Sequence, residues 1–213
     1  MRYVSSDRKG WLRYTERMKK NLKLVLNIFL LIIIPWAWLN MVFRGGGNFS
    51  ARGLWSLKFF TVLSKLFAAI AAFCRLFFRK KDFVPVLKMS SAIDVSITFL
   101  VTLCFLGPLF GFRAMYVGSN LWFHLIVPLL CIVEELFLSE REITRKEHLL
   151  CLIPLILYGC GYLGNILLNG REGNDWYAFT MWGMPVAIGI FAFLLLLNLG
   201  LGVLNQKIGR HFR

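Results

Sequence analysis

Six apolar runs, separated by short polar breaks, constrain this 213-residue chain more than any other feature. A helix of about 20 apolar residues is needed to cross the hydrocarbon core of a bilayer. We therefore expect an all-α integral membrane bundle forming one domain over residues 1–213, with spans near 24–43, 57–78, 92–112, 119–138, 149–168 and 182–204. The content of 58% hydrophobic and only 17% charged residues agrees, because soluble globular domains carry more charge.

The basic residues lie at the ends of these runs and predict the topology. Clusters occur in residues 1–23, in 79–88 and in the C-terminal tail, whereas 169–180 is nearly balanced in charge. Because basic loops stay in the cytoplasm, both termini are expected to be cytoplasmic. The formal net charge of +14 does not form a basic patch with interleaved aromatic residues, so no nucleic-acid partner is expected. Short loops and the absence of a retention signal favour a bacterial plasma membrane.

The cysteines give no sign of a disulfide framework or a metal site. All of them fall inside predicted spans without C-x-x-C spacing, and we interpret them as apolar packing residues: Cys74, Cys104, Cys131, Cys151 and Cys160. No metal and no cofactor is therefore expected. The expected partners are membrane lipids and a lipid-like or amphipathic small molecule, and the oligomeric state is not indicated.

Polar side chains inside the spans are costly and need an explanation. They are Lys58, Thr61, Ser64, Lys65, Arg75, Asp94, Asn120, His124, Glu134 and Glu135. Several have ordinary structural interpretations. Lys58 can extend to the headgroups, Glu134 and Glu135 can form a solvated pair beside Arg141, and Asp94 can favour the cytoplasmic N-terminus of the third span.

Thr61 and His124 are the strongest candidates for chemistry. Thr61 lies about four residues and His124 about five residues into its span from the outer face, so both are roughly 6–8 Å below the interface. A histidine that accepts a proton from a hydroxyl must be within hydrogen-bond reach, and equal depth is the least that this requires. The alternatives are a threonine bonded to its own i−4 carbonyl and a histidine that meets water.

Two motifs carry a family resemblance. The stretches 57-LKFFTVLSKLF-67 and 120-NLWFHLIVPLLCIVEE-135 resemble the androgen-induced family of six-pass intramembrane threonine hydrolases and its bacterial six-pass relatives. In the first stretch a lysine precedes the threonine by three residues, and in the second an asparagine precedes the histidine by four. The chain departs from the hydrolases at Leu121, where they carry a second histidine.

The resemblance implies a hydrolase of a lipid-like ester, similar to the enzymes that cleave fatty-acid esters of hydroxy fatty acids. Thr61 would be the nucleophile and His124 the base, with Lys58, Ser64, Lys65, Asn120 and Glu134 as candidate substrate-binding residues. Lys65 lies one turn below Thr61, where it can stabilise an oxyanion or a substrate carboxylate. It can equally form a structural pair with Glu134 or Asp94.

Two other classes of function stay open. The same polar residues can bind or transport a small amphipathic ligand without catalysis, although the two halves of the chain show no common motif of the kind found in many transporters. An accessory subunit can pack against a partner helix through small residues such as Gly107 and Gly111. Loss of labelling by an esterase probe in Thr61→Ala would distinguish the enzyme from both.

Overall fold

The computed structural model describes residues 4–43, 55–139 and 141–212, with side chains from residue 14 onward. No strand occurs in these ranges. The helices are α1 (Val4–Val42), η1 (Ser56–Lys58), α3 (Phe60–Phe77), α4 (Phe83–Val101), η2 (Thr102–Leu106), α5 (Gly107–Phe110), α6 (Phe112–Met115), α7 (Ser119–Leu121), η3 (Trp122–Ile126), α8 (Val127–Leu138), α9 (Arg145–Leu150), α10 (Ile153–Asn169), η4 (Phe179–Trp182) and α11 (Met184–Arg210).

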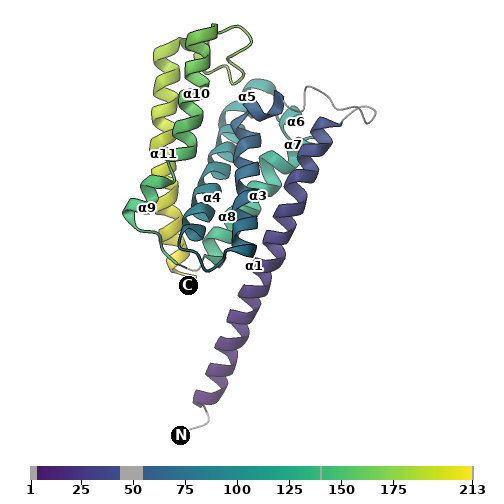
Figure 1. The fold of residues 1–213 in the computed structure, drawn as a ribbon, viewed down its shortest axis with the longest axis vertical. Helices are drawn as coiled ribbons and strands as arrows, with labels where there is room; N and C mark the ends of the chain where they lie inside the picture. The colour runs from purple at the N-terminus through teal and green to yellow at the C-terminus, as the bar shows by residue number, and fades with distance from the viewer. Residues whose placement is uncertain (1–3, 44–54, 140, 213) are drawn as a thin grey trace.

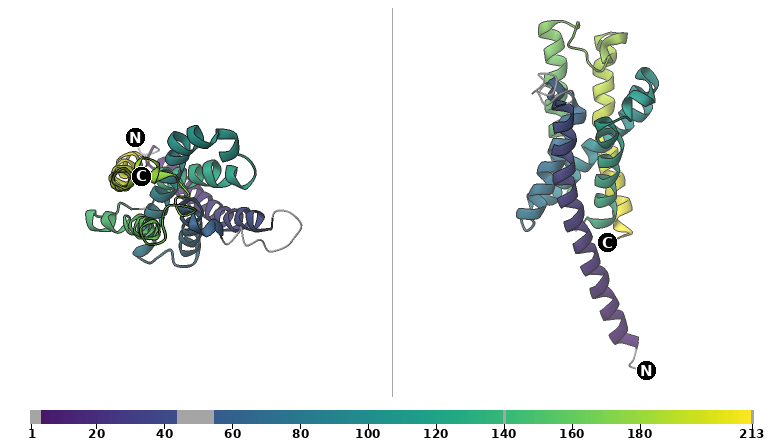
Figure 2. Two further views of the ribbon diagram at one scale, coloured as in Figure 1. Left: turned by 90° about the horizontal axis from the view of Figure 1, so that it is seen from above. Right: turned by 90° about the vertical axis from the view of Figure 1, so that its right-hand side faces the viewer.

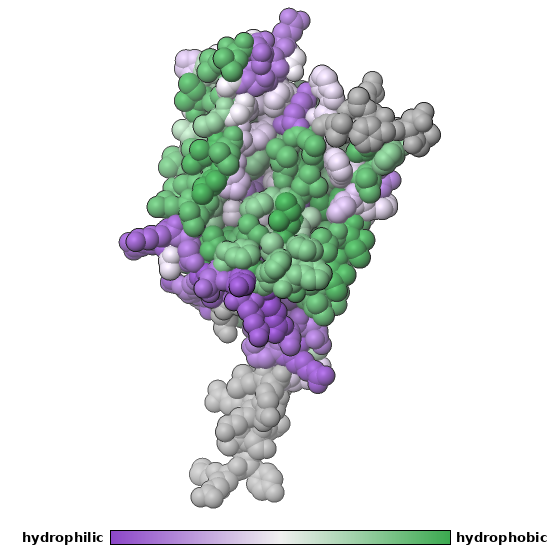
Figure 3. Space-filling view, in the orientation of Figure 1, coloured by the Kyte–Doolittle hydropathy of each residue, from purple (hydrophilic) through white to green (hydrophobic). Residues whose placement is uncertain are grey.

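Six of the described helical stretches are long and apolar enough to cross a membrane, which confirms the predicted fold class. They are Tyr14–Val42, Phe60–Phe77, Phe83–Phe110, Ser119–Leu138, Arg145–Asn169 and Met184–Arg210. Figure 3 shows a hydrophobic belt across the molecule, with hydrophilic side chains gathered at its lower end and near its top. Both ends of the chain lie toward the lower end of the bundle, as an even number of spans requires (Figure 1). That this end faces the cytoplasm stays a prediction.

Helix α4 lies at the centre of the bundle. It packs against α3 and α8 and also contacts α11, while α1 packs along α3 and α8 on the outside. Figure 2 shows α1 as a long helix that extends well past the others. In Figure 1, α10 and α11 lie side by side at the left and α1 lies at the right. Residues 88–98 of α4 are all buried, because protein surrounds this part of the helix.

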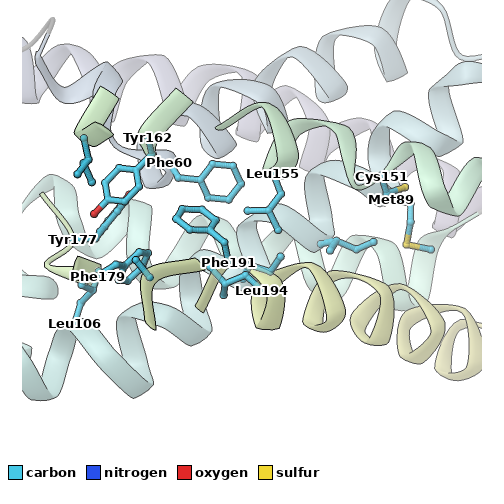
Figure 4. Packing of buried hydrophobic residues seen from close by; sticks show 14 of the residues in the cluster. Phe60, Met89, Leu106, Cys151, Leu155, Tyr162, Tyr177, Phe179, Phe191 and Leu194 are labelled. Atoms are coloured by element: carbon cyan, nitrogen blue, oxygen red, sulfur yellow. The ribbon is translucent and has the colours of Figure 1, made fainter. Parts of the chain in front are cut away.

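Two groups of buried side chains hold the helices together. One joins α1, α3 and α8 around residues such as Leu30, Ala68 and Val127. The other joins α3, α4, α10 and α11, and it contains an aromatic group at the end of the bundle opposite the termini, in which Tyr162, Phe179 and Phe191 pack with their ring centroids less than 7 Å apart. Figure 4 shows this group between the ribbons of α10 and α11.

The third span begins nearer the N-terminus than the apolar pattern predicts. The prediction started it at residue 92, but α4 begins at Phe83, because Lys88, Ser90 and Ser91 are buried between helices and do not face lipid. The interpretation of Asp94 as a residue at the start of this helix is therefore wrong. Asp94 is fully buried in the middle of α4.

The contact between α9 and α11 depends on the absence of a side chain at Gly202. A Cβ at Gly202 would lie 1.5 Å from Nε2 of His148, whereas a Cβ at Gly200 of the same helix would meet nothing within 4 Å. We expect Gly202→Ala to destabilise the fold by about 1–3 kcal/mol, because the buried His148 ring must move. Gly200→Ala is the matched control. Thermal unfolding of the purified variants measures the difference, and equal melting temperatures would contradict the close packing.

Candidate functional site

Thr61 lies in the first turn of α3, next to a break in the helix. Phe59 has an extended conformation, with φ −87° and ψ 128°, so the short helix η1 ends and α3 begins in a new direction. The Thr61 side chain is buried, with 7% of the residue exposed. The backbone N–H of Thr61 points out of the helix and donates to the hydroxyl of Tyr177 at 3.4 Å. The N-terminal end of the α3 dipole is therefore directed at the region around Thr61.

His124 lies within a π-helical segment, η3, and Thr102 begins a second one, η2. The two side chains meet: Oγ1 of Thr102 is 2.7 Å from Nδ1 of His124, and both residues are buried. Pro128 explains the widened turn at η3, since it has no N–H to donate to the carbonyl four residues earlier, which is that of His124. Pro108 has the same effect at η2. Such π segments are frequent at functional sites.

Thr61 and His124 line one cavity near the predicted outer end of the bundle. Its volume is about 240 Å³, and Asn120, Tyr177 and Trp176 are also part of its wall. Helix α3 contacts η3, so the two residues come from adjacent elements, as the equal depth suggested. The cavity thus contains a hydroxyl, an imidazole, an amide and a phenol in a mainly apolar setting.

The segment between α10 and α11 closes this cavity, and Asp175 holds the segment in place. The carboxylate of Asp175 accepts hydrogen bonds from the backbone N–H groups of Phe179 and Thr180, at 2.9 Å each, and from the hydroxyls of Thr180 and Tyr162. Burial acts to raise the pKa of Asp175, but the hydrogen bonds outweigh it, and the pKa lies below its ordinary value. The ionised carboxylate therefore orders the two residues that follow it, Trp176 and Tyr177.

The sequence reasoning did not single out Thr102 or Tyr177. The signal for Thr102 was available, because Thr98 and Thr102 are four residues apart and so share a face with Asp94 on one helix. Tyr177 gave no comparable signal, since it belongs to a loop distant from Thr61 in sequence. Burial raises the pKa of Tyr177, so its phenol stays neutral and able to donate a hydrogen bond.

Lys65 and Ser64 do not line the cavity that contains Thr61 and His124. The Lys65 side chain is fully buried and donates to the hydroxyl of Thr98 and, at 3.4 Å, to that of Ser64. Ser64 in turn donates to the carbonyl of Thr61 at 3.1 Å. Ser64 therefore contacts the backbone of Thr61 directly, and Lys65 is connected to it through Ser64.

Glu134 belongs to a different buried cluster. It forms an ion pair with Lys88 at 2.6 Å and accepts a hydrogen bond from Asn27 at 2.5 Å. The interpretation of Glu134 and Glu135 as a solvated pair beside Arg141 is wrong, because both glutamates are buried and Arg141 pairs with Glu147 at 2.6 Å. The alternative in which Lys65 pairs with Glu134 is also not formed, because Glu134 pairs with Lys88.

Lys58 and Asn120 lie at the predicted outer end of the bundle. The ammonium of Lys58 is over the rings of Trp55, Phe59 and Trp176, at 5.0–5.5 Å from their centroids. Asn120 lines the cavity and donates to the carbonyl of Ala114 at 2.9 Å. Of the predicted site residues, the structure thus brings Thr61, His124 and Asn120 together.

No group of three or more His, Cys, Asp or Glu side chains arranged to hold a metal ion occurs within residues 14–43, 55–139 and 141–212. Comparisons with protein-family models, with curated proteins and with solved structures find no match for this chain.

Proposed function

We propose that the protein is an intramembrane hydrolase of a lipid-like ester, with Thr61 as nucleophile and His124 as general base. The observation that carries the proposal is that these two side chains line one buried cavity, although 63 positions separate them in the chain. A threonine hydroxyl is a weak nucleophile and needs an adjacent base. The site would face the outer side of a bacterial plasma membrane.

The contact with Thr102 supports His124 as the base. The Thr102 hydroxyl has a single hydrogen, which it donates to the carbonyl of Thr98 at 2.8 Å. Its oxygen then accepts the hydrogen on Nδ1 of His124, 2.7 Å away. In a neutral imidazole this leaves the lone pair on Nε2. Thr102 thus selects the tautomer in which Nε2 can take a proton.

The reaction proceeds through an acyl-threonine. The Thr61 oxygen attacks the acyl carbonyl carbon, its proton passes to Nε2 of His124, and this proton then goes to the alkoxide that leaves. Water releases the acid by the same steps and restores the hydroxyl. The hydroxyl of Tyr177, which already accepts the backbone N–H of Thr61, is the donor available for the negative charge on the carbonyl oxygen.

An esterase-directed fluorophosphonate tests the proposal directly. We expect the purified wild type to be labelled covalently at Thr61, because the probe reacts with hydroxyls activated by a base. Thr61→Ala should not be labelled, while Ser64→Ala, which removes a hydroxyl outside the cavity, should be labelled like the wild type. Mass spectrometry of the labelled peptide identifies the position, and labelling at another residue would exclude Thr61 as the nucleophile.

The variant Thr102→Val tests the positioning of His124. Valine keeps the shape of the side chain and removes the hydroxyl, so the imidazole loses one hydrogen bond worth about 1 kcal/mol. We expect ester cleavage to slow by about fivefold, and the pH at which the rate is half-maximal should shift because the Nδ1 partner is gone. Steady-state rates across pH measure both effects. An unchanged rate and pH profile would show that Thr102 does not position His124.

A binding or transport protein for a small amphipathic ligand is the second candidate. It is favoured by a line of buried polar residues along α4 that hydrolysis leaves unused, namely Lys88, Ser91, Asp94 and Thr98. Under this alternative no covalent step needs Thr61, and Thr61→Ala should weaken ligand binding only by the value of one hydrogen bond.

A further inference from the structure

Asp94 is a buried carboxyl group without a hydrogen-bond partner. Neither of its oxygens accepts a hydrogen bond within the described ranges, and none of its surface is exposed. An isolated ionised carboxylate is very unfavourable in an apolar interior, so such a group must be protonated or paired with a cation. Its position in the middle of α4 places it far from both ends of the span.

Asp94 also lines a groove separate from the proposed hydrolase cavity. The groove has a volume of about 510 Å³, within the range of small-molecule sites. It runs between α3 and α10, with residues such as Phe60, Phe67 and Tyr158 in its walls and Trp176 at its outer end. Figure 3 shows this face of the molecule, where a paler strip separates the hydrophobic surfaces of the two helices.

The walls and the base of the groove favour a ligand with an apolar body and a positive charge. Aromatic faces attract cations as well as apolar groups, and Phe60 and Tyr158 line the groove beside Trp176, whose ring already has the ammonium of Lys58 over it. The unpartnered carboxylate supplies the counter-charge. Because the groove lies between helices that face lipid, a ligand enters it from the hydrocarbon and must be lipid-soluble.

The two neighbouring lysines are already occupied. Lys58 lines the groove at its outer end, but its ammonium lies over three aromatic rings. Lys65 interacts electrostatically with Asp94, but its ammonium donates to the hydroxyls of Thr98 and Ser64, and Lys65 does not line the groove. Neither lysine therefore satisfies the oxygens of Asp94.

We propose that the groove between α3 and α10 binds a lipophilic organic cation, with the Asp94 carboxylate as its counter-ion. The site shares Trp176 with the hydrolase cavity but none of Thr61, Thr102 or His124. Its existence does not depend on hydrolysis.

Binding of tritiated tetraphenylphosphonium to the purified protein, measured by scintillation proximity in detergent, tests the site. We expect saturable binding that Asp94→Asn weakens by about tenfold or more, the loss expected when a charged contact is removed. Tetraphenylborate, of the same shape and opposite charge, should compete poorly. Equal competition by the anion, or unchanged binding in Asp94→Asn, would overturn the proposal.

Two glycines of α10 provide a test that leaves the carboxyl intact. A Cβ at Gly161 or at Gly164 would meet nothing within 4 Å, so both positions accept a larger side chain. Only Gly161 lines the groove. Gly161→Leu should therefore reduce binding by about tenfold or more, while Gly164→Leu and Thr61→Ala should bind like the wild type. Unchanged binding in Gly161→Leu would overturn the proposal even if Asp94→Asn did not fold, and retained binding in Thr61→Ala separates this site from the hydrolase.

Discussion

Replacing either Thr61 or His124 by alanine should abolish ester cleavage, with a loss of about 10⁴-fold or more in each case. The two losses should be nearly equal, and the double variant should be no worse than either one, because a nucleophile and its base act as a unit. Initial rates on a panel of aryl and alkyl esters measure the effect. Thermal unfolding of each variant is the control, since neither side chain carries a large part of the packing.

The same assay decides the role of Lys65. Loss of an oxyanion donor costs about 10²–10³ in rate, whereas loss of a structural residue lowers stability. Since Lys65 is bonded to Thr98 and does not line the cavity, we expect Lys65→Ala to lower the melting temperature and to retain more activity than Thr61→Ala. Full activity in Thr61→Ala would refute the catalytic proposal.

Breaking the buried ion pair between Lys88 and Glu134 should cause the largest loss of stability among single changes. Both side chains are more than nine-tenths buried, and Asn27 bonds to both of them, at 3.1 Å to the lysine and 2.5 Å to the glutamate. Lys88→Met leaves the glutamate charged and unpaired in the interior, at a cost of about 3–5 kcal/mol. Glu134→Gln should cost nearly as much, because the ammonium then loses its counter-charge.

A double variant and a surface pair serve as controls for this prediction. Lys88→Met combined with Glu134→Leu removes both charges and should recover much of the stability, since apolar replacements of a buried pair are often tolerated. Arg210 and Glu142 form an exposed pair at 2.7 Å. Glu142→Gln should therefore leave the free energy of unfolding almost unchanged. Chemical denaturation of the purified variants in detergent measures their free energies of unfolding. If the double variant were as unstable as Lys88→Met, the unpaired charge of Glu134 would not be the cause of the instability, and the prediction would be wrong.

The two parts of the candidate site differed in how far they could be predicted. Thr61 and His124 were found because polar groups are conspicuous in apolar spans and their depths follow from counting along helices. Thr102 and Tyr177 were missed because their importance comes from what they touch: Thr102 meets His124 across two helices, and Tyr177 meets Thr61 across a loop. Residue types and spacings contain no information about such contacts until the helices are packed.

The sequence by itself determined the fold class and the number of apolar spans, because the hydrocarbon core selects for run length and penalises polar groups wherever they occur. Only the tertiary structure decided which polar groups are partners. It placed Lys88, Asp94 and Glu134 in the interior although their positions suggested helix ends, and it separated Glu134 and Lys65 from the cavity of Thr61. The physical reason is that hydropathy measures transfer of a residue into lipid, while the cost of a buried polar group depends on its neighbours, which come from other helices.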